Sequence, residues 1–141
     1  MSLPSFTQVA SGLLLAAFVV VMAAGLDLTR VRLATRMLKG RADLDRFRRA
    51  IDRQRYLCLG LILLFVGWGV VVLVGLLGGW CRPEDVSLEV ASGVPLLVSK
   101  LWLRYVEAKF KAVPTANAKV QAAWNRALWE WEESPIPDWS F

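Results

Sequence analysis

Residues 56–80, YLCLGLILLFVGWGVVVLVGLLGGW, contain no charged side chain and decide the fold class of this 141-residue chain. A helix needs about 20 apolar residues to cross the ~30 Å hydrocarbon core of a bilayer. Tyr56 and Trp80 stand at the two ends, where amphipathic rings favour the headgroup level. We therefore predict that residues 56–80 form a transmembrane helix.

A second apolar segment precedes this one. Residues 9–26, VASGLLLAAFVVVMAAGL, are 18 residues long, and the first charge of the chain is Asp27. At about 1.5 Å per residue, this segment just reaches the thickness of the hydrocarbon. A cleaved signal peptide is the competing interpretation, but it requires a basic region ahead of the apolar run, which the sequence lacks. We predict a retained span, so that residues 1–80 form a transmembrane hairpin.

The connection between the two spans, residues 27–55, is strongly basic. It carries ten Lys/Arg and four Asp, whereas the chain after Trp80 carries seven Lys/Arg and eight Asp/Glu. Basic flanks stay on the cytoplasmic or matrix side of a membrane. The charge bias predicts that 27–55 lies inside, and that the N-terminus and residues 81–141 lie outside. The membrane would be the bacterial cytoplasmic or the mitochondrial inner membrane.

The connection also has helical periodicity. Its apolar residues recur at intervals of three and four on either side of Gly40: Leu28, Val31, Ala34 and Leu38, then Leu44, Phe47 and Ile51. We expect both spans to continue as helices beyond the membrane, with a turn at Gly40 and the second helix starting at Ala42 or Asp43.

Five arginines of the connection form a candidate site for anionic lipid such as cardiolipin: Arg46, Arg48, Arg49, Arg53 and Arg55. Juxtamembrane basic clusters attract lipid phosphates at about 1 kcal/mol per charge. Nucleic acid is the poorer partner, because four Asp interleave with these arginines and a bilayer is adjacent. A plain topology signal explains the same charges at least as well.

The second span contains four glycines that we regard as candidates for helix packing: Gly60, Gly67, Gly75 and Gly79. Small residues let helices approach closely in lipid, where packing drives association. Glycine is also frequent in membrane helices that make no such contact.

Residues 81–141 are expected to form an arm outside the membrane. After a polar connector, residues 95–113 read as an amphipathic helix that lies on the membrane surface or against other proteins. A short Trp-rich helix is predicted over 118–133, with Thr115 or Asn117 as its cap. Pro135 and Pro137 then impose an extended tail.

Six aromatic residues of this arm are predicted to contact a partner chain: Trp102, Trp124, Trp129, Trp131, Trp139 and Phe141. Tryptophan is enriched at buried interface positions, and so small an arm is not expected to bury these rings by itself. An aromatic belt at the membrane interface is the alternative, and a stacking site for a carbohydrate or nucleotide is a third.

Composition disfavours most kinds of chemistry. The chain has no histidine and two cysteines, which excludes His-ligated metals, Ser-His catalysis and a zinc site made of cysteines. The spans lack the charged and amide side chains that proton and ion pathways need. We therefore predict no catalytic, metal-binding or cofactor-binding residue.

Together these features predict an all-α membrane protein with a two-span hairpin, an amphipathic interfacial helix, a short Trp-rich helix and an extended tail. The expected function is that of a non-catalytic accessory subunit of a multi-subunit membrane complex, for example a respiratory or ATP-synthase-type assembly. The alternative is a small homo-oligomeric protein that perturbs membranes or forms a pore. A third interpretation is a signalling protein whose arm senses a ligand.

Overall fold

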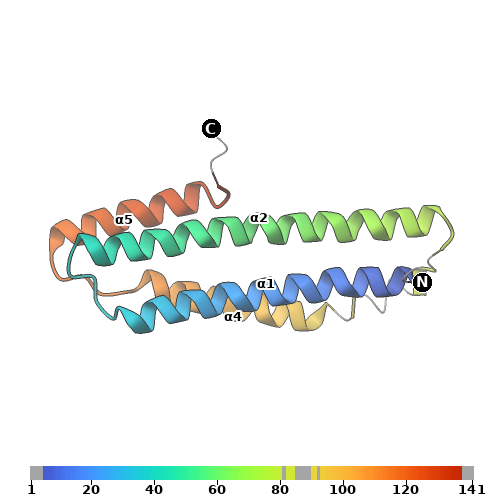
Figure 1. The fold of residues 1–141 in the computed structure, drawn as a ribbon, viewed down its shortest axis with the longest axis horizontal. Coiled ribbons are helices and arrows are strands. Elements are labelled where there is room, and N and C mark those ends of the chain that lie inside the picture. Colours follow the sequence, from blue (N-terminus) through green and yellow to red (C-terminus); the bar gives the residue numbers. More distant parts are fainter. Residues whose placement is uncertain (1–4, 81, 85–89, 92, 138–141) are drawn as a thin grey trace.

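The structure, a computed structural model, describes residues 5–80, 82–84, 90–91 and 93–137. Over these residues it contains four helices: α1 (Phe6–Ala34), α2 (Arg41–Leu77), α4 (Val94–Lys111) and α5 (Ala118–Glu133). α1 and α2 form an antiparallel hairpin, α4 returns alongside α1, and α5 lies beside the first half of α2 (Figure 1). The predicted all-helical architecture is confirmed, and α1 and α2 are long and apolar enough to span a membrane.

Local signals in the sequence explain where the helices begin. Ser5 and Gln8 form a capping box at the start of α1, in which each side chain accepts a hydrogen bond from the other residue's backbone N–H. Asn117 caps α5 by accepting from the Val120 N–H at 2.9 Å, which confirms one of the two predicted caps. The turn at Gly40 is confirmed as well, and α2 begins directly after it at Arg41.

α2 ends in a glycine turn. Gly79 has a φ of +72°, which is a left-handed conformation that a residue with a Cβ rarely adopts. The Trp80 N–H then donates to the Gly75 carbonyl at 3.0 Å, and the chain leaves the helix. This arrangement gives Gly79 a role in the helix end that the prediction of helix packing did not include.

An aromatic core holds one end of the molecule together. Phe47 of α2, Phe110 of α4 and Trp124 of α5 pack with ring centroids 4.8–5.6 Å apart, and all three are at most 1 % exposed. Next to them, the Leu38 N–H donates to the Pro114 carbonyl at 2.9 Å, which joins the two interhelical connections. We call this end, residues 27–55 together with 103–133, the head.

The head corrects the predicted placement of the C-terminal arm. Residues 27–55 and 81–141 were assigned to opposite sides of a membrane, yet Phe47 lies against Trp124, and Arg55 Nη2 donates to the Glu130 carbonyl at 3.2 Å. A bilayer cannot separate segments that are in contact. The prediction failed because a charge bias compares whole segments and contains no information on tertiary contacts.

The other end of the hairpin is apolar and largely uncovered. We call it the stalk: residues 6–26 of α1 and 56–77 of α2. In the most apolar windows of the two helices, only 28 % and 11 % of the residues are buried. The core helix of a water-soluble protein would be mostly buried, so the stalk needs lipid or another protein to cover it.

Candidate functional site

A groove lined by arginines lies on the part of the hairpin that belongs to the head, with Asp27 and Arg53 at its end nearest the stalk. It has a volume of about 620 Å³, and Arg46, Arg49 and Arg53 line it from successive turns of one face of α2. Arg30 joins them from α1, together with a single carboxylate, Asp27. We call this site the basic groove.

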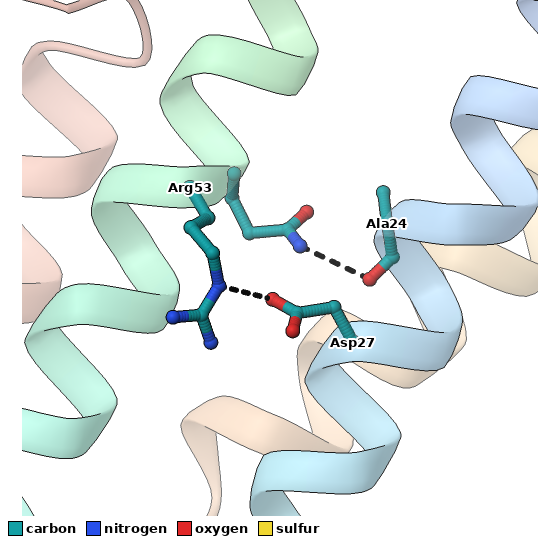
Figure 2. Close-up of polar contacts among 4 residues, drawn as sticks. Ala24, Asp27 and Arg53 are labelled. Carbon is teal, nitrogen blue, oxygen red and sulfur yellow. Dashed lines mark hydrogen bonds and ion pairs between the residues drawn. The ribbon is translucent and has the colours of Figure 1, made fainter.

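One ion pair partly neutralises the basic groove. Figure 2 shows Arg53 of α2 facing Asp27 of α1, with Arg53 Nε donating to Asp27 Oδ2 at 3.0 Å. Arg49 Nε donates only to the Asp45 carbonyl of its own helix, at 3.3 Å. Three of the four arginines that line the groove lack a carboxylate partner among the described residues: Arg30, Arg46 and Arg49.

A buried amide fixes the register of the two helices beside this ion pair. The Gln54 side chain is 5 % exposed, and its Nε2 donates to the Ala24 carbonyl of α1 at 3.0 Å, which is the second contact in Figure 2. Because a buried amide must be hydrogen-bonded, this contact resists sliding of α2 along α1. The same register brings Arg30 level with the arginines of α2.

The basic groove can bind a phosphate or another multivalent anion. Guanidinium groups donate two parallel hydrogen bonds to phosphate oxygens, and several of them face one space here. Asp27 is the first charged residue after the apolar part of α1, and Arg55 is the last before that of α2. The groove therefore lies at the level that lipid headgroups would occupy if the stalk is inserted.

The structure divides the five predicted lipid-binding arginines into two groups. Arg46, Arg49 and Arg53 line the groove, whereas Arg48 does not. Arg55 Nη1 lies 3.6 Å from Asp52 Oδ1, and Arg55 Nη2 donates a hydrogen bond to the Glu130 carbonyl of α5. Arg55 therefore connects α2 to α5 within the head. Arg30 was missed, although the antiparallel pairing of α1 with α2 across a turn at Gly40 could have indicated it.

A second cavity, of about 220 Å³, lies between α1, α2, α4 and the end of α5, and we call it the mixed cavity. Three charged residues of α4 line it, namely Lys100, Glu107 and Lys111. Lys111 Nζ pairs with Glu132 Oε1 of α5 at 3.0 Å. Burial raises the pKa of the Glu107 carboxyl above its usual 4.5, and Lys111, Lys100 and Arg104 oppose that shift by charge attraction.

α4 is apolar on two sides, because it buries Leu96, Leu103, Val106 and Phe110 inside the molecule and leaves a second apolar face uncovered. Its charged stripe borders a cavity, while a broad outward face is apolar and 56–62 % exposed: Val94, Leu97, Val98, Leu101 and Tyr105. We call these five residues the outer face of α4. Such a face suits lipid or a protein neighbour and not water.

The aromatic residues that were predicted to contact a partner chain differ in how far this chain itself buries them. Trp124 and Trp131 are 1 % and 8 % exposed within this chain, so these two rings do not need a partner chain to bury them. The head supplies the missing surface, because α2 contributes Phe47 to the same cluster. Trp102 is half-buried and packs against Gly25, whereas Trp129 is 58 % exposed and stays a candidate contact. Trp139 and Phe141 lie outside the described residues.

The glycines that were predicted to pack against a helix differ in whether another part of this chain lies against them. A Cβ at Gly75 would collide with the Phe6 ring, so this glycine permits close contact between α2 and the start of α1. A Cβ at Gly60, Gly67 or Gly79 would meet no atom within 4 Å. Gly60 and Gly67 remain available to a helix outside this chain. A Cβ at Gly25 of α1, which the sequence did not single out, would collide with the Trp102 ring of α4.

No group of three or more His, Cys, Asp or Glu residues that could hold a metal occurs in the described part of the chain. Comparisons of the chain with protein-family models, curated proteins and solved structures gave no match.

Proposed function

We propose that this protein is a non-catalytic accessory subunit of a multi-subunit membrane complex, which it enters as a two-span hairpin to support assembly and stability. The observation that carries the proposal is the position of α4. Its first turn lies beside the stalk, because Gly93 and Leu96 share an apolar cavity with Leu14 and Trp68. Trp68 is at the midpoint of the uncharged segment 56–80.

A helix that starts at this depth needs a protein neighbour. The first turn of a helix has backbone N–H groups without intrahelical partners, and hydrocarbon offers no acceptor for them. Gly93 is the N-cap of α4 and provides no side chain to accept from them. Re-entrant helices are tolerated where protein or a water-filled cavity surrounds them. A partner subunit on the outer face of α4 would meet this need.

The proposed topology follows from the contacts of the head. Because residues 27–55 carry the basic excess and α5 packs on them, the whole head would lie on the cytoplasmic or matrix side. The basic groove would then face anionic headgroups of the same leaflet. A respiratory or ATP-synthase-type assembly is the class of complex that we favour, since basic pockets on that side bind cardiolipin.

Purification of the tagged chain in a mild detergent tests the proposal. We expect the wild-type chain to co-purify with a defined set of larger membrane proteins. Leu101→Glu, on the outer face of α4, should remove them, because a buried unpaired charge is costly at an interface. Ala122→Glu is the matched control, since Ala122 is exposed on α5 and away from the outer face.

Two results would contradict the proposal. One is a wild-type chain that is stable and monomeric. The other is a homo-oligomer that makes vesicles leak, which would instead support the pore-forming alternative, with the open surface at Gly60 and Gly67 as its contact face.

A further inference from the structure

We propose that an anionic phospholipid of the inner leaflet is held between α2 and α4, with its phosphate at Lys100 and one acyl chain in the adjoining apolar cavity. This inference rests on the proposed membrane insertion. It concerns a site on the face of the hairpin that α4 covers, separate from the basic groove, with which it shares no lining residue.

The apolar cavity has the size and lining that an acyl chain requires. Its volume is about 340 Å³, within the range of ~300–1,000 Å³ typical of small-molecule sites. Leu14, Phe65, Trp68 and Leu97 line it from three helices, and Lys100 is the only charged residue among its lining. A helix, at ~10 Å across, is too wide for such a space, whereas a single hydrocarbon chain is not.

Lys100 connects the apolar cavity to the mixed cavity. It lines both, and it makes no hydrogen bond or ion pair with any other described residue. An ammonium group at the end of an apolar space is the arrangement that an anionic amphiphile matches, because one end of the ligand is charged and the rest is apolar.

The carboxylates nearby do not cancel this charge. Glu132 is already paired with Lys111 at 3.0 Å. Burial raises the pKa of Glu107, and its charge attraction is shared among Lys111, Lys100 and Arg104. The local field therefore favours an anion at Lys100.

The depth of the two cavities matches a lipid of the leaflet that faces the head. Lys100 lines the mixed cavity with Gln54 and Leu61, near the boundary between head and stalk. The apolar cavity continues to Trp68, at the middle of the uncharged segment. A phospholipid has the same order along the membrane normal, with the phosphate at the boundary and the chain end at the centre.

The test uses the full-length chain in phosphatidylcholine vesicles that contain phosphatidylglycerol with a photoreactive group at the end of one acyl chain. After illumination, we expect crosslinks on Phe65, Trp68 or Leu97. Lys100→Gln should lower the crosslink yield at limiting lipid by roughly tenfold, the factor expected for one charge-assisted hydrogen bond. Leu97→Trp should abolish it by filling the cavity.

Two control variants separate this site from other effects. Arg104→Gln removes a charge from the same helix but lines neither cavity, so the yield should be unchanged. Arg46→Gln combined with Arg49→Gln weakens the basic groove and should leave these crosslinks intact. Thermal unfolding of each variant checks that the fold is retained.

Each possible result decides between the proposals. Equal yields in the wild type and in Lys100→Gln, or an equal loss in Arg104→Gln, would overturn the lipid site. A photoreactive phosphatidylcholine that crosslinks as well as phosphatidylglycerol would overturn the role of Lys100. If alkaline carbonate extracts the wild-type chain from membranes, the membrane insertion itself is wrong, and both proposals fail. An inserted chain without crosslinks contradicts only the lipid site.

Discussion

Phe47 and Phe110 stack with their ring centroids 4.8 Å apart and an interplanar angle of 20°, and each is 0 % exposed. The first belongs to the basic connection between the two apolar segments, and the second to the helix that we expected on the far side of a membrane. This contact fixes α4 to the head, so that the stalk is left as the uncovered apolar part of the molecule.

The first prediction concerns topology. Single cysteines introduced at Ala42 and at Ser134, in a chain whose Cys58 and Cys81 are replaced by serine, should both be protected from impermeant thiol reagents in intact cells or mitoplasts. Ala42 is near the tip of the hairpin, and Ser134 directly follows α5, which packs on the same end. Permeabilisation should expose both positions. Labelling of Ser134→Cys alone in intact cells would contradict the contact between α5 and the connection.

The second prediction concerns the aromatic core of the head. Trp124→Ala should lower the free energy of unfolding by about 3–5 kcal/mol, because a fully buried ring is replaced by a cavity. Trp129→Ala, at an exposed position on the same helix, should change it by about 0.5 kcal/mol or less. Denaturant unfolding in detergent, followed by tryptophan fluorescence and helix content, measures both values. Similar effects of the two changes would mean that α5 does not pack as described.

How much of this architecture the sequence could predict depends on the range of each interaction. The apolar segments, the turn at Gly40 and the cap at Asn117 were predicted because each depends on neighbouring residues. The position of α4 was not predicted, because the charged residues of α4 have the spacing of a solvent-exposed face. In the structure, three of them line the mixed cavity. The contact of Trp124 with Phe47 depends on tertiary packing, which periodicity cannot reveal.

The candidate site shows the same limit. The arginines of α2 that line the basic groove share a helical face, and three of the five residues predicted from composition are among them. Arg30 was not among the predicted residues, but it lines the groove because α1 and α2 pair as antiparallel helices. Arg55 was predicted but does not line the groove, because its side chain is hydrogen-bonded to α5. Composition therefore located the charge, whereas tertiary structure determined which side chains share a space.

The third prediction concerns the contact between α1 and α4. Gly25→Ala should destabilise the chain by about 1–3 kcal/mol, because the added Cβ would collide with the Trp102 ring. Gly12→Ala is the matched control in the same helix. Its Cβ would meet no atom within 4 Å, so the higher helix propensity of alanine should make it neutral or stabilising by up to about 1 kcal/mol. Adding Trp102→Ala to Gly25→Ala should cost less than the sum of the two single changes, as measured by thermal unfolding.

The fourth prediction concerns the basic groove. Arg46→Gln combined with Arg49→Gln should weaken binding of a soluble short-chain phosphatidylglycerol by about 2 kcal/mol, or roughly thirtyfold, at about 1 kcal/mol per charge. The control pair, Arg41→Gln with Arg48→Gln, removes the same charge from residues that do not line the groove. Isothermal calorimetry in detergent compares them. Equal weakening by the two pairs would mean that the lipid responds to net charge and not to this groove.

The last prediction concerns pH. Burial raises the pKa of Glu107 in the folded chain, so between the unfolded value near 4.5 and the raised value the folded state binds the proton more tightly than the unfolded state. The contribution of Glu107 to the free energy of unfolding is therefore fully present below about pH 4.5, and it is lost as the pH rises through the folded-state pKa. Lys111, Lys100 and Arg104, which lie on α4 together with Glu107, limit the loss by charge attraction.

Glu107→Gln should remove this pH dependence, because the amide is neutral at every pH. The variant should match the wild type most closely at acid pH and become increasingly more stable than the wild type as the pH rises towards neutrality. Melting temperatures of both chains in one detergent, across a series of buffers, provide the comparison. Two curves that stay parallel over the whole range, or a variant that loses stability relative to the wild type as the pH rises, would mean that the Glu107 carboxylate is well solvated or well paired. The mixed cavity would then be an open, hydrated cleft instead of a partly dry site.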